Sequence, residues 1–266
     1  MIGPIIGDMA GSRFERHNHL SKDFDLWHRD ATYTDDTVMS LAICNALMQS
    51  APDYSEVGIH AVKTMQEYGR RNLRRGYGGY FLQWLLSPRP QPYGSYGNGG
   101  PMRVAGCGWA GSTLDEVKRL SKAVTEVTHN HPEALKGAEA VATTVFLARH
   151  GASRDELREW VIRNYYPLDF TLDEIRGTYT FDVSSQGSVP QALEAFFEST
   201  DFEDAIRNAV SAGGDSDTIA CMAGAVAEAF YGVSQDLREA AEARLSEPLK
   251  KVLHDFEQQY PPHTEQ

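Results

Sequence analysis

The segment from Gly213 to Thr218, with the apolar run behind it, constrains the fold of this 266-residue chain more than any other stretch. Apolar residues follow it at helical spacing, which predicts a buried helix: Ile219, Met222, Ala223, Val226 and Phe230. Residues two apart on a helix point in nearly opposite directions, so Asp215 and Asp217 can share a ligand only if Asp215 lies in the preceding turn. The glycines before it permit such a turn. Two carboxylates and the Thr218 hydroxyl suit a hard cation such as Mg²⁺ or Mn²⁺, although a simple helix cap is the alternative.

A second acidic cluster lies far upstream, where Thr34, Asp35, Asp36 and Thr37 precede a run from Val38 to Met48 that is apolar nearly all round. Such a run predicts another buried helix. The two acids can simply complement the helix dipole, or they can bind metal. If the two helix starts meet, their carboxylates repel one another unless cations or protons neutralise them. The pair of clusters therefore predicts a site for two divalent ions, surrounded by Thr34, Asp35, Asp36, Asp215, Asp217 and Thr218.

The first residues, 2–15, predict a helix with small residues along one face, because Gly3, Gly7 and Gly11 recur at every fourth position. That face allows a second helix to approach closely. The same segment carries Asp8 and Glu15, and the pattern leaves open whether packing alone or a functional role explains them. Residues 16–33 show no period and are expected to form a loop.

A stretch rich in proline, glycine and tyrosine runs from Pro88 to Gly100 between predicted helices. Long irregular stretches of this kind are more often functional than simple linkers. Its second half can present backbone N–H groups to a diphosphate, with Tyr93 or Tyr96 as a ring on which a base stacks. It is not a dinucleotide-binding fingerprint, because no strand precedes it and Met102 stands where a third glycine is needed. A mobile loop is the alternative.

The rest of the chain also shows helical rather than alternating strand patterns. Further helices are predicted over 54–72, 112–127, 133–149, 153–164, 191–199, 202–210 and 234–258, and 165–186 receives no assignment. No repeat and no domain boundary is evident. We therefore predict an all-α fold, a single compact orthogonal helical bundle spanning residues 1–266, with a binuclear metal cleft.

Charge and cysteine content limit the partners and the compartment. The net charge of −12 disfavours a nucleic-acid surface, although helix ends or metal ions can still bind a small anionic ligand. Three cysteines provide neither a disulfide framework nor zinc-binding spacing. No basic leader and no long apolar stretch is present, so we expect a cytoplasmic protein that does not insert into membranes. No exposed apolar seam is predicted, which favours a monomer.

Six motifs taken in order give the chain a resemblance to a known family. They are Gly7-Asp8 with Gly11 and Glu15, Thr34-Asp35-Asp36-Thr37, Asn98-Gly99-Gly100-Pro101-Met102-Arg103, Thr128-His129 with His131-Pro132, Gly187-Ser188-Val189-Pro190, and Gly213-Gly214-Asp215-Ser216-Asp217-Thr218-Ile219-Ala220. This pattern resembles the ADP-ribosylglycohydrolase family over essentially the whole chain. Pro101 stands where alanine is common and Ser216 where threonine is common, and neither change removes a metal-binding group.

The resemblance implies an all-α fold with two Mg²⁺ or Mn²⁺ ions at the base of a cleft. One ion would be held by Thr34, Asp35, Asp36 and Asp217, the other by Asp215, Asp217 and Thr218, with Glu15 nearby. It also implies an ADP-ribose site formed by Tyr93, Tyr96, Asn98, Gly99, Gly100, Met102, His131, Gly187, Ser188 and Val189. Glu15, Asp35 and Asp36 are then the catalytic candidates, and either Glu15 or Asp36 is the expected general base.

The function that follows is metal-dependent hydrolysis of the N- or O-glycosidic bond between ADP-ribose and a modified target, releasing ADP-ribose. Arginine-linked protein substrates are favoured, and serine-linked ones are the second choice. The alternatives are a catalytically silent ADP-ribose-binding protein, a hydrolase of ADP-ribosylated nucleobases or small ADP-ribose derivatives, and a metal phosphohydrolase acting on a nucleotide.

Overall fold

The computed structural model describes residues 1–261, and in this range it contains helices and no strand. A lone antiparallel bridge joins Gly97 to Ser184. The helices in chain order are α1 (Ile2–Gly11), α2 (Asp35–Ser50), α3 (Val57–Arg71), α4 (Gly79–Leu86), η1 (Pro101–Arg103, a 3₁₀ turn), α5 (Ala105–Ala110), α6 (Leu114–Thr125), α7 (Pro132–Arg149), α8 (Arg154–Asn164), α9 (Leu172–Ile175), α10 (Ser185–Phe197), α11 (Phe202–Ala212), α12 (Ser216–Tyr231), α13 (Gln235–Glu242) and α14 (Glu247–Gln259). The all-α prediction is confirmed.

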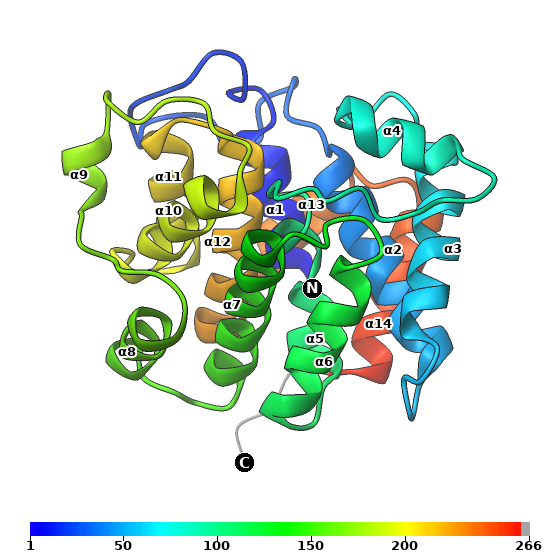
Figure 1. The fold of residues 1–266 in the computed structure, drawn as a ribbon. Helices are drawn as coiled ribbons and strands as arrows, with labels where there is room; N and C mark the ends of the chain where they lie inside the picture. The colour runs from blue at the N-terminus through cyan, green and yellow to red at the C-terminus, as the bar shows by residue number, and fades with distance from the viewer. Residues whose placement is uncertain (262–266) are drawn as a thin grey trace.

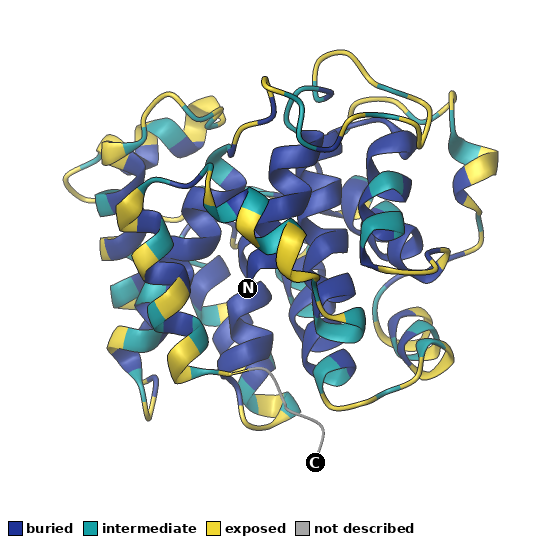
Figure 2. Cartoon of the chain, turned by 180° about the vertical axis from the view of Figure 1, so that it is seen from behind, coloured by how far each residue is buried: buried dark blue, intermediate teal, exposed yellow. Residues whose placement is uncertain are grey.

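Helices α1 and α12 form the centre of the molecule (Figure 1). On one side, α12 packs against α7, α10 and α11. On the other, α2 packs against α3, α5 and α14. The buried residues are concentrated in these inner helices, whereas the outer helices and loops carry the exposed residues (Figure 2). Two helices that are far apart in the sequence thus form the core against which the other helices pack.

Glycines allow α1 and α12 to pack with their backbones in contact. A Cβ atom placed on Gly7 would lie 2.0 Å from the Ala220 carbonyl oxygen, and one on Gly3 would lie 2.4 Å from that of Gly224. Every residue of α1 is buried. The expected close helix approach is therefore confirmed, but the helix ends at Gly11 and not at residue 15. The Phe14 amide bonds to the Gly11 carbonyl, so the chain leaves the helix in a tight turn.

The turn before α12 has the form that the sequence predicts. Gly213 and Gly214 have φ values of 86° and 70°, in a region that favours glycine. Asp215 is the N-cap residue, so it lies in the turn, and the helix begins at Ser216. Because only Asp217 lies within the helix, the two side chains need not point in the opposite directions that two such positions in one helix would take.

Several other boundaries differ from the predicted ones. α10 begins at Ser185 rather than at residue 191, because Pro190 removes only one backbone hydrogen bond and Ser184 caps the helix by accepting from the Gly187 amide. The predicted helix over 234–258 is two helices, α13 and α14, separated at residues 243–246. The short helices α4, α5 and α9 were not predicted.

No helix in residues 1–261 is both long enough and apolar enough to span a membrane.

Candidate functional site

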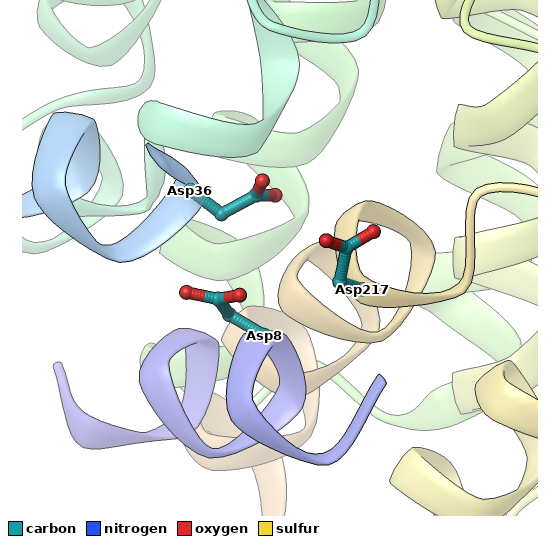
Figure 3. A group of neighbouring side chains, drawn as sticks. All are labelled: Asp8, Asp36 and Asp217. Atoms are coloured by element: carbon teal, nitrogen blue, oxygen red, sulfur yellow. The ribbon is translucent and has the colours of Figure 1, made fainter. Parts of the chain in front are cut away.

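Three buried carboxylates from three different helices meet at one point. Asp8 comes from α1, Asp36 from the first turn of α2 and Asp217 from the first turn of α12, and their carboxylates point toward one another (Figure 3). One oxygen of each lies within 4.8 Å of the others. The helix starts that carry the two acidic clusters are therefore adjacent, and α1 lies beside both of them.

Asp8 fixes the start of α2 relative to α1. Its carboxylate accepts hydrogen bonds from the backbone amide of Thr34 at 2.9 Å and from the Thr34 hydroxyl at 2.7 Å. The amide and the hydroxyl of Thr37 also donate to it. Both Asp8 oxygens are thus used within the protein. The sequence left the role of Asp8 open, and its position on an otherwise apolar, glycine-containing helix was the available signal.

Asp36 retains an oxygen that is free for a ligand. Its Oδ2 accepts a hydrogen bond from the Thr218 hydroxyl at 3.3 Å and lies 3.2 Å from the Thr34 hydroxyl oxygen, whose proton is directed to Asp8. Its Oδ1 is buried and has no hydrogen-bond partner. A buried carboxylate oxygen without a partner is costly, so this atom is suited to bind a cation or a proton.

Asp215 and Asp217 are held by neighbouring amides. The Asn98 side-chain nitrogen donates to Asp215 Oδ2 at 2.6 Å, which joins the glycine-rich loop to the acidic cluster. The Thr218 amide donates to Asp217 Oδ1 at 3.0 Å. Asp215 therefore lies between the loop and the helix start, with its carboxylate oriented by Asn98.

Burial and mutual repulsion disfavour the charged forms of these acids. Burial, and then the charge of Asp8, raises the pKa of Asp35 to about 8. Burial, and then neighbouring carboxylates, raises the pKa values of Asp36 and Asp217 well above the ordinary range. Burial is also the largest cause of the raised pKa of Glu15.

The cluster fits hard divalent cations. It offers carboxylate and hydroxyl oxygens only, which are the ligands that Mg²⁺ and Mn²⁺ prefer. It also contains more negative charge than a buried site retains without compensation. Such an ion would provide the buried Asp36 Oδ1 with the partner that it lacks within the protein.

A cavity of about 390 Å³ opens above the cluster. Its wall includes every candidate metal ligand and catalytic residue taken from the sequence: Glu15, Thr34, Asp35, Asp36, Asp215, Asp217 and Thr218. Four of the candidate ADP-ribose residues line it as well: Tyr93, Asn98, Gly99 and Met102. The structure thus brings most of the candidates to one cavity.

The other candidate ADP-ribose residues lie beside this cavity or behind its wall. Tyr96 is 54% exposed, and its ring meets that of His131 at 5.5 Å, while His131 caps α7 through its side chain. Gly100 and Val189 are buried. Ser188 accepts a hydrogen bond from Asn98 at 3.1 Å, and the Gly187 carbonyl accepts one from Tyr179.

Sequence reasoning did not select several residues of the cavity wall. Arg103 and His129 are buried there, whereas Tyr80, Phe181 and Val183 are exposed. His129 stands two residues before His131, the histidine that the sequence analysis assigned to the site, and it is His129 that lines the cavity. The signal for Arg103 was its place at the end of the glycine-rich motif.

Comparisons with known proteins agree with this architecture. A family model described as ADP-ribosylglycohydrolase matches residues 1–263. ADP-ribosylhydrolase ARH3 of Homo sapiens is 29% identical over 311 aligned residues, which cover 88% of this chain and 85% of that protein. ADP-ribosylarginine hydrolase Tri1 of Pseudomonas putida is 28% identical over 262 aligned residues, which cover 88% of this chain and 70% of that protein. A solved structure described as an ADP-ribosylglycohydrolase-related protein complex matches with a TM-score of 0.71 over 97% of this chain and 95% of its own, at 22% identity, which indicates a shared fold.

Proposed function

The chain belongs to the ADP-ribosylglycohydrolase family, and we propose that it hydrolyses the glycosidic bond between ADP-ribose and a modified target with the help of divalent cations. The observation that carries the proposal is the buried acidic cluster at the floor of the cavity, with an unpartnered Asp36 oxygen. Buried acids that only stabilised the fold would be expected to have their oxygens satisfied.

The metal ligands in this proposal are those of the two helix starts. Thr34, Asp35, Asp36 and Asp217 would hold one ion, and Asp215, Asp217 and Thr218 the other. Asp8 supports them from behind, because its oxygens already bond to Thr34 and Thr37. When bound, Mg²⁺ or Mn²⁺ would supply positive charge that orients the ribose and favours ionisation of its oxygens or of water.

We assign the role of general base to Glu15 rather than Asp36. Glu15 lines the cavity with 25% of its side chain exposed, so it can reach a water molecule. Asp36 is almost fully buried and already accepts the Thr218 hydroxyl. In the hydrolytic step, water attacks the anomeric carbon of the ribose and its proton passes to Glu15. The electron pair of the broken bond leaves with the nitrogen or oxygen of the target, which takes up a proton from solvent.

The glycine-rich loop is proposed to bind the rest of ADP-ribose. Tyr93, Asn98, Gly99 and Met102 line the cavity and are assigned to direct contacts. Asn98 donates to both Asp215 and Ser188, so the loop is anchored to the metal ligands and to α10. Gly187, Ser188 and Val189 support it from the start of α10, and Tyr96 with His131 extends it toward the surface.

Arginine is the acceptor that we favour. Glu15, which is not among the proposed metal ligands, gives the cavity wall a carboxylate that can attract a cationic guanidinium. One relative, Tri1, is by name an ADP-ribosylarginine hydrolase. Serine-linked ADP-ribose is the second choice, because the same anomeric carbon would be attacked.

The test is release of free ADP-ribose from arginine-linked and serine-linked substrates, side by side, in Mg²⁺, Mn²⁺ or EDTA. We expect release that depends on metal and is faster from the arginine substrate. Tight binding of ADP-ribose without release from either substrate or from ADP-ribosylated nucleobases would identify a silent binding protein. AMP or phosphate as the product would identify a phosphohydrolase.

A further inference from the structure

Arg103 is a buried cation on the cavity wall that has no carboxylate partner. Its side chain is fully buried, and residues 1–261 provide no salt bridge to it. The guanidinium lies 5.8 Å from the centre of the Phe81 ring. One of its nitrogens, Nη2, donates to the Val124 carbonyl at 3.2 Å and to the Thr128 hydroxyl at 2.6 Å. Because guanidinium cannot accept, the Thr128 oxygen must accept in this pair.

The Thr128 hydroxyl proton then has two neighbouring acceptors. One is the Thr125 carbonyl at 3.4 Å, and the other is His129 Nδ1 at 2.6 Å. The Thr125 carbonyl already accepts the backbone amides of His129 and Thr128, at 2.9 and 3.2 Å, so both of its lone pairs are occupied. The hydroxyl therefore donates to His129 Nδ1, which leaves that nitrogen unprotonated.

The surroundings of His129 keep the ring neutral. Burial, and then the positive charge of Arg103, lowers the pKa of His129 well below its usual value. Of the rings beside it, Phe81 does not titrate, and Tyr93, at 5.8 Å between ring centres, is neutral because burial raises its pKa to about 12. A neutral imidazole that accepts at Nδ1 carries its proton on Nε2.

The Nε2 edge of the ring faces the glycine-rich loop and the cavity. A Cβ atom on Gly99 would lie 3.1 Å from Nε2, and one on Gly97 would lie 3.6 Å away. His129 lines the cavity, and no group within the described part of the chain bonds to Nε2. The proton that the chain of hydrogen bonds places on Nε2 is therefore available to a ligand.

We infer that Arg103 and Thr128 are positioning residues that hold His129 as a fixed neutral donor, whose Nε2–H binds an acceptor oxygen of the ADP-ribose moiety. The ligand part of this inference rests on the proposed function, whereas the tautomer does not. A donor that needs no protonation works across the neutral pH range, unlike an imidazolium. Arg103 contributes through Thr128 and through its field, because its remaining nitrogens are buried from the cavity.

The tautomer can be measured directly by ¹⁵N NMR of histidine-labelled protein, with His129→Gln identifying the resonances by their loss. We expect protonated Nε2 and unprotonated Nδ1, without titration between about pH 5.5 and 8. Thr128→Val removes the hydroxyl at similar volume and should allow the other tautomer, whereas Thr128→Ser should retain the original one. A wild-type ring protonated at Nδ1, or a ring that titrates in this range, overturns the inference.

Calorimetric binding of ADP-ribose to the same variants tests the ligand contact. Thr128→Val should weaken binding by about threefold to tenfold, the equivalent of one hydrogen bond, and Thr128→Ser should change it by less than about twofold. Equal affinities for the two variants overturn the ligand role of His129. If the wild-type protein binds no ADP-ribose, the proposed function fails, and the NMR result still decides the hydrogen-bond chain.

Discussion

The Asp8 carboxylate accepts two hydrogen bonds from Thr34, at 2.9 Å from the amide and 2.7 Å from the hydroxyl. This contact joins α1 to the start of α2, and the glycine face of α1 joins the same helix to α12. The relative positions of Asp36 and Asp217 therefore depend on α1, although Asp8 has no oxygen left over for a ligand.

Replacing Asp8 with asparagine should destabilise the protein. An amide has one oxygen for four donors, and its NH₂ group would face a threonine donor in a buried site. We expect the free energy of unfolding in urea to fall by about 1–3 kcal/mol, and Mn²⁺ binding to weaken. Asp30→Asn is the control, because the Asp30 side chain is 66% exposed. Equal unfolding free energies for the two variants would show that the Asp8 contacts contribute nothing specific.

The stability of the metal-free protein should depend on pH through the acidic cluster. The pKa of Asp35 is raised to about 8 in the folded state, and those of Asp36 and Asp217 are also raised, so folding favours their protonated forms. This contribution is fully present below about pH 4, where the unfolded carboxyls are protonated too, and is lost as pH rises through about 8. In EDTA, Tm should therefore fall from pH 5 to pH 8. An increase in Tm over that interval would contradict the raised pKa values.

Asp36→Asn should have opposite effects with and without metal. In EDTA at pH 8, the substitution removes a carboxyl group that must be buried either as a repelled charge or by taking up a proton, so Tm should rise relative to wild type. In saturating Mn²⁺ it removes the unpartnered ligand oxygen, so the Mn²⁺-induced increase in Tm should shrink and ADP-ribose release should fall. Calorimetric scans of both proteins in both buffers provide the comparison. A full Mn²⁺ response in Asp36→Asn would exclude Asp36 as a ligand.

Glu15→Gln should separate chemistry from binding. If Glu15 is the general base, kcat should fall by about 10²–10⁴-fold, while ADP-ribose affinity changes little. Single-turnover release and calorimetric binding measure the two effects. A similar loss of affinity and rate would mean that Glu15 binds the ligand, and an unchanged kcat would return the base role to Asp36.

Gly7→Ala should test the backbone contact between α1 and α12. Its Cβ atom would lie 2.0 Å from the Ala220 carbonyl oxygen, so the helices must separate and the free energy of unfolding should fall by roughly 3 kcal/mol or more. Gly58→Ala is the matched control, because Gly58 also lies in a helix and its nearest contact would be at 3.4 Å. Urea denaturation of both variants, with Mn²⁺ titration of the folded protein, gives the comparison. A stable Gly7→Ala variant with normal Mn²⁺ binding would show that the close approach is not needed.

The helical architecture and the two acidic helix starts could be predicted because their signals are local. Asp36 and Asp217 each precede an apolar run at helical spacing, and glycines fix Asp215 in a turn. Asp8 carries no such signal, because its partners Thr34 and Thr37 are brought to it only by the tertiary fold. The choice between His129 and His131 likewise depends on which ring faces the cavity.

Short helices could not be predicted because their stability comes from packing rather than from their own sequence. α4 has eight residues and begins at Gly79, which is a poor helix former. It is held by Phe81, Trp84 and Leu85, which are buried against the rest of the molecule. α10 was predicted too short for the opposite reason. Gly187 and Pro190 indicate a loop in the sequence, but the cap at Ser184 allows the helix to begin at Ser185.

The central position of α1 has a consequence for how the protein is made. This helix (Ile2–Gly11) is synthesised well before α12 (Ser216–Tyr231), which covers much of its surface. Until α12 has been synthesised, this apolar segment lacks its native partner, and exposed apolar surface of this kind promotes aggregation or chaperone binding. The contacts that complete the acidic cluster also join distant parts of the chain, which slows folding. Substitutions that delay the packing of α1 against α12 should thus cause loss of function as readily as substitutions of the proposed metal-binding residues.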